Sequence, residues 1–113
     1  MDKNISKKTE IKINVGLNKD NVPVEMDWIA SDNPNVDKPE SCKAMLLSLF
    51  DREQKDTLKI DLWTHDMQVD EMDRFFYQTL RGLGDTYFKA TQNRALAIAV
   101  SYTHLTLPTT PYV

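Results

Sequence analysis

The 113-residue sequence has one cysteine and no long apolar run, and each absence excludes a class of protein. The single Cys42 cannot form an intramolecular disulfide or build a multi-cysteine zinc site. No apolar segment approaches the roughly 20 residues that a membrane-spanning helix requires. Residues 1–12 are polar and charged and lack the apolar core of a secretory signal. We therefore expect a cytoplasmic protein without direct membrane insertion.

Positive charge is not in excess either, because 14 lysine and arginine residues stand against 17 aspartate and glutamate residues, for a formal net charge of −3. Proteins that bind nucleic acid through its phosphates usually carry a basic surface. We therefore expect no nucleic-acid partner. The chain shows no internal repeat and no linker-like stretch, so residues 1–99 are expected to form a single domain.

The sequence does contain two pairs of strand-like segments. Residues 11–17 and 22–28 alternate between apolar and polar side chains and are joined by a short polar turn, which predicts a β-hairpin. The apolar run 43–50 and the alternating segment 58–63 predict a second hairpin. Residues 31–41 contain two prolines and no apolar periodicity, and they are expected to form the connecting loop.

A helical pattern follows the strands. Apolar residues recur at spacings of three and four after Asp66, which we interpret as the N-cap of an amphipathic helix. Gly82 and Gly84 fall inside this pattern and predict a bend or a close approach to the sheet. Asn93 is suited to cap a second helix that begins at Arg94.

These elements predict an α+β fold, in which a four-stranded antiparallel sheet of two hairpins is packed by a C-terminal helix, with a truncated second helix at the end. Strand alternation and helical spacing define the expected core. Its members are Leu47, Leu49, Ile60, Leu62, Met72, Phe76 and Leu80.

The last fourteen residues, 100–113, differ from the rest of the chain because they are rich in threonine and contain no acidic or basic residue except His104. Residues 100–109 resemble the conceptual translation of a transposase adapter used in sequencing libraries. We therefore expect a non-native tail in place of the natural C-terminus, with a genuine threonine-rich tail as the alternative. We expect no functional residue in this segment, His104 included.

Three segments of the remaining chain form a distinctive series: AMLLSLFD at 44–51, LKIDLWT at 58–64, and the stretch 66–80, which ends in FFYQTL. Together with Asp85-Thr86 and Lys89-Ala90-Thr91, they resemble the gliding-motility protein GldC family of gliding Gram-negative bacteria. The resemblance spans roughly residues 9–99. It implies a small protein that works with other gliding-motility proteins, and it implies no enzymatic activity, catalytic residue or cofactor.

Several large side chains are expected to point away from the predicted core. Strand alternation places Trp63 on the face opposite Leu62. On the helix, three adjacent aromatic residues cannot all face the core. The candidate partner-binding residues are Leu46, Phe50, Asp61, Trp63, His65, Phe75 and Tyr77. The alternative is that a further helix or the curvature of the sheet covers this face.

Two other groupings have ordinary structural explanations. Asp61, His65 and Asp66 contain the ligands of a small metal or acid–base site, but a solvated strand followed by a helix cap also explains them. Cys42 and His65 contain the parts of a thiol nucleophile, but nothing in the sequence places them together. We assign no catalytic residue, metal or cofactor.

The sequence therefore favours a non-enzymatic accessory or adaptor protein of a bacterial gliding-motility apparatus, acting by protein–protein contact. A small-ligand-binding module that uses the concave face of the sheet is the first alternative, and a metal-dependent enzyme is the second. An adaptor requires an exposed contact surface, a ligand module requires an enclosed apolar pocket, and an enzyme requires converging polar side chains.

Overall fold

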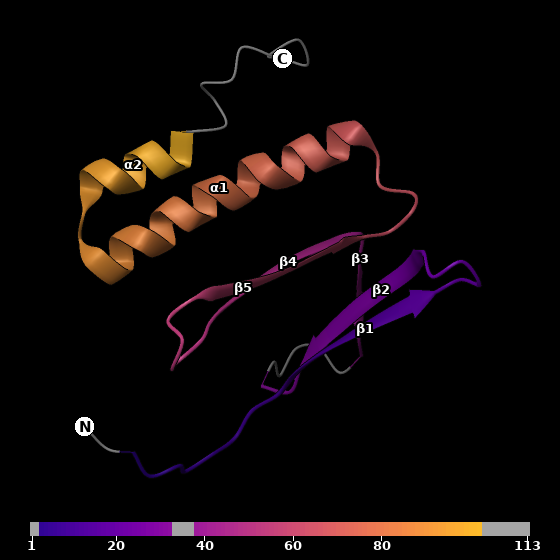
Figure 1. Cartoon of the computed structure of the whole chain (residues 1–113), viewed down its shortest axis with the longest axis horizontal. Coiled ribbons are helices and arrows are strands. Elements are labelled where there is room, and N and C mark those ends of the chain that lie inside the picture. The colour runs from indigo at the N-terminus through magenta and orange to yellow at the C-terminus, as the bar shows by residue number, and fades with distance from the viewer. Residues whose placement is uncertain (1–2, 33–37, 103–113) are drawn as a thin grey trace. The chain divides into compact units, whose positions relative to one another are not determined.

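The computed structural model describes residues 3–32 and 38–102 (Figure 1). The chain divides into two compact units, residues 1–67 and residues 68–113. The first unit contains all the β-strands and the second contains both helices, and each unit is described by itself.

The first sheet contains β1 (Ile11–Leu17), β2 (Pro23–Ala30) and β3 (Glu40–Cys42), which are antiparallel and lie in the order β1-β2-β3. The predicted first hairpin is confirmed. Its turn is held by the side chain of Asn18, whose Oδ1 accepts the backbone N–H groups of Asp20 at 2.8 Å and Val22 at 3.1 Å. Proline has no N–H to donate to a ladder, which fits the place of Pro23 as the first residue of β2.

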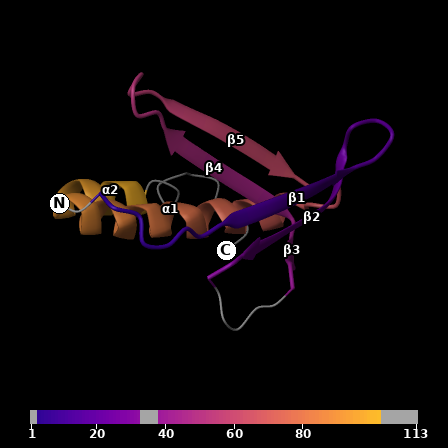
Figure 2. The same cartoon turned by 90° about the horizontal axis from the view of Figure 1, so that it is seen from below.

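The second sheet contains β4 (Ala44–Phe50) and β5 (Thr57–Trp63), which run antiparallel side by side (Figure 2). The predicted second hairpin is therefore confirmed as well. Asp51 holds its turn, since the carboxylate accepts the backbone N–H groups of Glu53 at 3.1 Å and Gln54 at 2.6 Å.

The prediction of one four-stranded sheet is wrong, because the five strands form a three-stranded and a two-stranded sheet. Only Lys43, where the backbone bends, separates β3 from β4. Residues before the bend pair with β2 and residues after it pair with β5. The Lys43 carbonyl accepts the backbone N–H of Thr64 at 2.8 Å, which holds the bend against the end of β5.

The predicted loop 31–41 is also corrected at its end, because Glu40 and Ser41 belong to β3 and pair with Trp28 and Asp27 of β2. The polar sequence of this short strand gave no alternation to recognise. Residues 33–37 of the predicted loop lie outside the described residues.

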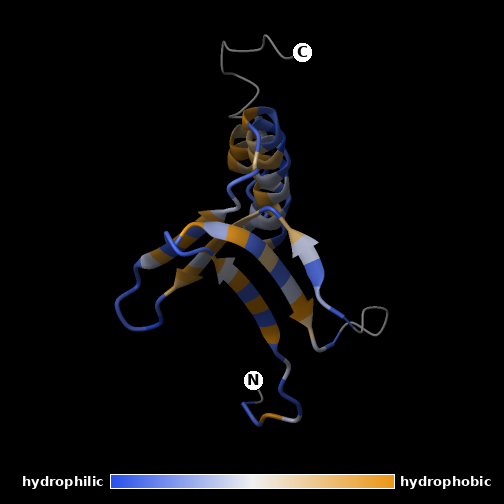
Figure 3. Cartoon of the chain, turned by 90° about the vertical axis from the view of Figure 1, so that its right-hand side faces the viewer, coloured by the Kyte–Doolittle hydropathy of each residue, from blue (hydrophilic) through white to orange (hydrophobic). Residues whose placement is uncertain are grey.

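Apolar and polar residues alternate along the strands of the first sheet (Figure 3). The register pairs Ile13 with Trp28 and Val15 with Met26, so these residues share one face. Met26 is only 1% exposed and is the most deeply buried large side chain of the described residues. The apolar face is therefore covered at Met26, whereas Val24 of the same strand is 39% exposed.

The predicted core is only partly correct. Leu47, Leu62, Met72 and Leu80 are half-buried, whereas Leu49, Ile60 and Phe76 are exposed. Leu49 lies near the turn of a two-stranded hairpin, where no third strand of its sheet flanks it. Alternation indicates which residues share a face, but it does not indicate how far that face is covered.

The second unit consists of α1 (Val69–Thr91) and α2 (Arg94–Tyr102). The predicted cap at Asp66 is wrong, because the N-cap of α1 is Gln68, whose backbone N–H donates to Glu71 Oε1 at 2.9 Å. The predicted cap of the second helix is confirmed, since Asn93 Oδ1 accepts the backbone N–H of Leu96 at 3.1 Å. No helix of the described residues is long and apolar enough to cross a membrane.

Helix α2 folds back along the C-terminal half of α1 (Figure 1). Gly84 allows this approach, because a Cβ atom there would lie 2.7 Å from the Ala97 carbonyl and would also meet Ser101 Oγ. The sequence predicted a close approach of this glycine to the sheet, whereas its nearest neighbours are residues of α2, within the helical unit. Gly82 has open space where its Cβ would be. Helix α2 includes the first three residues of the predicted non-native tail, and residues 103–113 of it lie outside the described residues.

Candidate interaction surface

The β4–β5 hairpin presents two different faces. Its register places Ala44 opposite Trp63, Leu46 opposite Asp61 and Phe50 opposite Thr57. Directly paired residues of antiparallel strands project to the same side of a sheet. The candidates Leu46, Phe50, Asp61 and Trp63 therefore share one face, and the leucine-rich set around Leu62 occupies the other.

These candidates do not form one continuous apolar patch. Trp63 and Phe50 lie at opposite ends of the hairpin, about 20 Å apart at the usual rise of a β-strand. Between them, the Lys59 ammonium and the Asp61 carboxylate form an ion pair of 3.2 Å. Trp63 is 52% exposed and Phe50 is 69% exposed. The face therefore carries two separate exposed aromatic side chains.

Trp63 borders a surface hollow of about 290 Å³, which we call the Trp63 hollow. It forms where the end of β5 meets the start of β2, because the backbone N–H of His65 donates to the Pro23 carbonyl at 3.0 Å. Its lining residues are Val22, Pro23, Asp61, Leu62, Trp63 and His65. The hollow is open, and its volume lies at the lower end of the roughly 300–1,000 Å³ of small-molecule sites.

Thr64 anchors the backbone beside this hollow. It is 3% exposed, and its hydroxyl donates to Asp66 Oδ1 at 2.6 Å. This hydrogen bond is the main reason why the pKa of Asp66 is lowered. Desolvation opposes it to a smaller extent, and the positive charge of Lys43 lowers the pKa further. Asp66 is thus held as a carboxylate that fixes the segment leading into α1.

The other polar candidates do not converge on a reaction centre. Asp61 pairs with Lys59, and Asp66 is bonded to Thr64. In residues 3–32 and 38–102, no three His, Cys, Asp or Glu side chains are grouped to hold a metal ion. Burial, followed by the negative charge of Asp27, raises the pKa of the Cys42 thiol, which disfavours the nucleophilic thiolate.

Phe75 and Tyr77 lie on α1, in the other unit, and both are half-buried. The ring of Phe75 meets the ring of Phe76 edge to face, with centroids 6.0 Å apart. The Tyr77 hydroxyl accepts a hydrogen bond from Arg81 Nη1 at 3.1 Å, and the guanidinium lies 5.8 Å from the tyrosine ring centroid. Both residues therefore make side-chain contacts within α1.

The family model of gliding motility-associated, GldC-like proteins matches residues 23–106, well over half of the chain. The chain belongs to the GldC-like family. The family resemblance expected from the sequence is thereby confirmed, and it associates the chain with gliding motility. No curated protein and no solved structure matches the sequence.

The GldC-like match includes every residue of the Trp63 hollow except Val22, and it begins after β1. Sequence reasoning identified Asp61, Trp63 and His65 but missed Pro23 and Val22. These two residues lie beside the end of β5, where the backbone N–H of His65 donates to the Pro23 carbonyl. No local pattern in the sequence signals that contact.

Proposed function

We propose that this GldC-like chain is a non-enzymatic adaptor of a bacterial gliding-motility apparatus, and that it binds another motility protein through the Trp63 hollow. The observation that carries the proposal is the exposure of Trp63, which leaves half of a large aromatic side chain in water beside a preformed hollow. Tryptophan is among the residues that most often dominate the binding energy of protein interfaces.

The surroundings of Trp63 support binding because they are held in place before a partner arrives. Thr64 and His65, the two residues that follow it, donate backbone hydrogen bonds to Lys43 and Pro23. A surface that is already ordered loses less conformational entropy on binding. Asp61 and His65 place polar groups around the apolar centre, which is the usual arrangement of an interface.

The test is a replacement of the chromosomal gene in a gliding bacterium that carries it. Because Trp63 is half-exposed, we expect Trp63→Ala to change the free energy of unfolding by about 1 kcal/mol or less. We expect the same variant to abolish colony spreading and the capture of a partner by a photocrosslinker placed at His65. Truncation of such a residue usually weakens binding by about 2 kcal/mol or more.

Phe50→Ala is the matched control, because it removes an exposed aromatic residue from the same face at the far end of the hairpin. It should leave spreading and crosslinking unchanged. If Trp63→Ala is folded and still supports normal spreading, the Trp63 hollow is not the contact surface. If the two variants impair spreading equally, the effect is not specific to the hollow.

A further inference from the structure

Strand β1 is an open edge of the three-stranded sheet. It is seven residues long and contains no proline, and the register shift at its end reflects an extra residue in β2. The opposite edge, β3, has only three residues and follows Pro39. The outer edge of β5 ends against Pro23. Long unprotected edge strands are uncommon because they pair readily with another strand.

The backbone hydrogen bonds at the two ends of β1 show which of its N–H and C=O groups face β2 and which face outward. The Glu10 carbonyl accepts the N–H of Ser31 at 2.9 Å, and the N–H of Asn18 donates to Val22 at 3.0 Å. Even-numbered residues of the strand therefore bond to β2, and the backbone groups of Ile11, Ile13, Val15 and Leu17 point outward.

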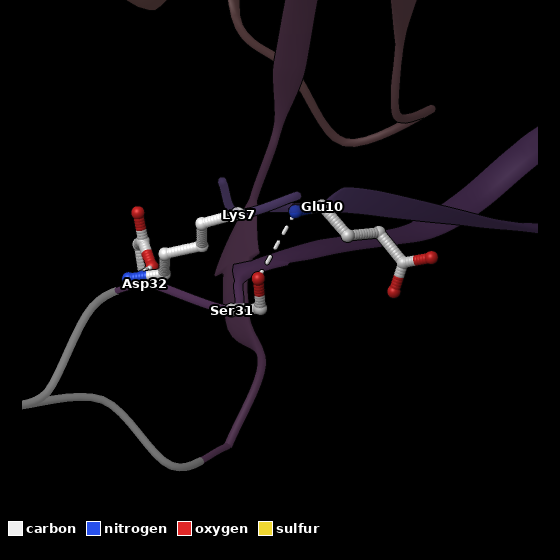
Figure 4. Close-up of polar contacts among 4 residues, drawn as sticks. All are labelled: Lys7, Glu10, Ser31 and Asp32. Atoms are coloured by element: carbon white, nitrogen blue, oxygen red, sulfur yellow. Dashed lines mark hydrogen bonds and ion pairs between the residues drawn. The ribbon is translucent and has the colours of Figure 1, made fainter. Parts of the chain in front are cut away.

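The chain before β1 is held toward β2 (Figure 4). The backbone N–H of Glu10 donates to Ser31 Oγ at 3.0 Å, and the Lys7 ammonium lies 2.9 Å from the Asp32 carboxylate. Both contacts are made to residues that follow β2, and no strand of residues 3–32 and 38–102 pairs with the outer edge of β1.

We propose that this edge binds a second copy of the chain, with the two β1 strands antiparallel around a two-fold axis at Asn14. This pairing sets Ile11 opposite Leu17 and Ile13 opposite Val15, and each outward N–H and C=O gains a partner. Ile11 is 71% exposed and Leu17 is 53% exposed in the single chain. The pairing extends the apolar face of the sheet across both copies.

The other face of the sheet supplies charge complementarity. The same register sets Lys12 of one copy opposite Gly16 of the other. Gly16 pairs with Glu25, and a carboxylate oxygen of Glu25 lies 3.9 Å from the position that a Cβ of Gly16 would take. Lys12 of the second copy therefore lies about 10 Å from Glu25, measured between Cα atoms, with no side chain between them. Two symmetric ion pairs follow.

One neighbouring register is disfavoured by charge. A two-fold axis at Ile13 sets Glu10 of one copy opposite Gly16, beside Glu25 of the other. Like charges directly across a strand pair are destabilising. The axis at Asn14 avoids this repulsion.

The test measures the mass of the full chain by sedimentation equilibrium over a concentration series. We expect a monomer–dimer equilibrium for the parent chain, and roughly tenfold or greater weakening of the dimer by Lys12→Glu or by Glu25→Lys. An equimolar mixture of these two variants should form a heterodimer, because each reversed charge then meets an opposite one. Lys59→Glu, on β5, is the control and should leave dimerisation unchanged.

A crosslink tests the register. In a Cys42→Ser background, Asn14→Cys should form an intermolecular disulfide, because residue 14 meets itself in a non-hydrogen-bonded pair with Cα atoms about 4.5 Å apart. Lys12→Cys should not form such a disulfide.

A chain that stays monomeric at every concentration overturns the proposal. The proposal is also overturned if Lys59→Glu disrupts the dimer or if Lys12→Glu leaves the dimer intact. The Trp63→Ala variant should dimerise like the parent chain. The dimer proposal and the proposed function of the Trp63 hollow can therefore fail separately.

Discussion

At the scale of single residues, Thr64 shows how one small side chain organises a surface. Its backbone N–H reaches Lys43, its hydroxyl reaches Asp66, and it lies directly after the exposed Trp63. Threonine is common at strand ends, so its identity did not predict this role. A buried hydroxyl that donates to a carboxylate forms a charge-assisted hydrogen bond, which is stronger than a neutral one.

Asp66 provides a prediction about pH. Its pKa is lowered from an ordinary value of 3.8, mainly by the hydrogen bond from Thr64. A carboxyl group whose pKa is lower in the folded chain stabilises that chain above the unfolded pKa, and this contribution disappears as the pH falls through the folded pKa. The melting temperature of the parent should therefore exceed that of Asp66→Asn at neutral pH, and the difference should vanish in acid.

Thermal melting of both chains from neutral pH down to about pH 2 measures this difference, with Thr64→Val as a third chain. Removal of the Thr64 hydroxyl should flatten the pH dependence that Asp66 contributes. A difference between the parent and Asp66→Asn that grows as the pH falls would contradict the assignment.

At the scale of elements, the two helical glycines make a matched pair. In a helix interior, alanine is favoured over glycine by roughly 1 kcal/mol. Gly82→Ala adds a methyl group in open space and should raise the free energy of unfolding by about that amount. Gly84→Ala brings Cβ within 2.7 Å of the Ala97 carbonyl, and the strain should lower the free energy of unfolding by about 1–3 kcal/mol.

Chemical denaturation of the two variants measures both changes. The pair controls for helix propensity, since the same substitution is made two residues apart in the same helix. If Gly84→Ala is as stable as Gly82→Ala, α2 does not lie against α1 at this glycine.

The elements themselves were largely predictable from sequence, but their assembly was not. Alternation identified both hairpins, and Asn93 marked the start of α2. The bend at Lys43 has no such signal, because a lysine directly before an apolar segment is equally suited to a continuous strand. Asp66 has the sequence character of a cap, yet its carboxylate is taken by Thr64, and the helix begins two residues later than expected.

The candidate site was predictable to the same extent. The alternation of side chains along each strand placed Leu46, Asp61 and Trp63 on one face of the hairpin. It could not reveal that an ion pair separates Trp63 from Phe50, or that Pro23 lies beside the end of β5. The second fact depends on a contact between residues that are distant in the sequence.

At the scale of the whole molecule, the bounds of α2 give a prediction about the C-terminal segment. Val100 and Ser101 are half-buried residues of α2, and Ser101 lies against Gly84. We therefore expect removal of residues 103–113 to leave the melting temperature unchanged, consistent with a non-native tail. Removal of residues 100–113 should lower it, because the last turn of α2 is lost.

Differential scanning calorimetry of the full chain and of chains that end at residues 99 and 102 makes this comparison. A large loss of stability in the chain that ends at residue 102 would contradict the interpretation of the tail. Equal melting of all three chains would show that the last turn of α2 contributes nothing.

The bend at Lys43 also has a mechanical consequence. The backbone beside Trp63 is bonded to Lys43, at the junction of the two sheets, and to Pro23 at the start of β2. A pulling force applied by a partner seated on Trp63 is therefore shared between both sheets, because these hydrogen bonds carry the load in parallel. A hairpin attached to one sheet alone would be peeled away one bond at a time. For a protein associated with cell movement, such an attachment resists tension where a partner would exert it.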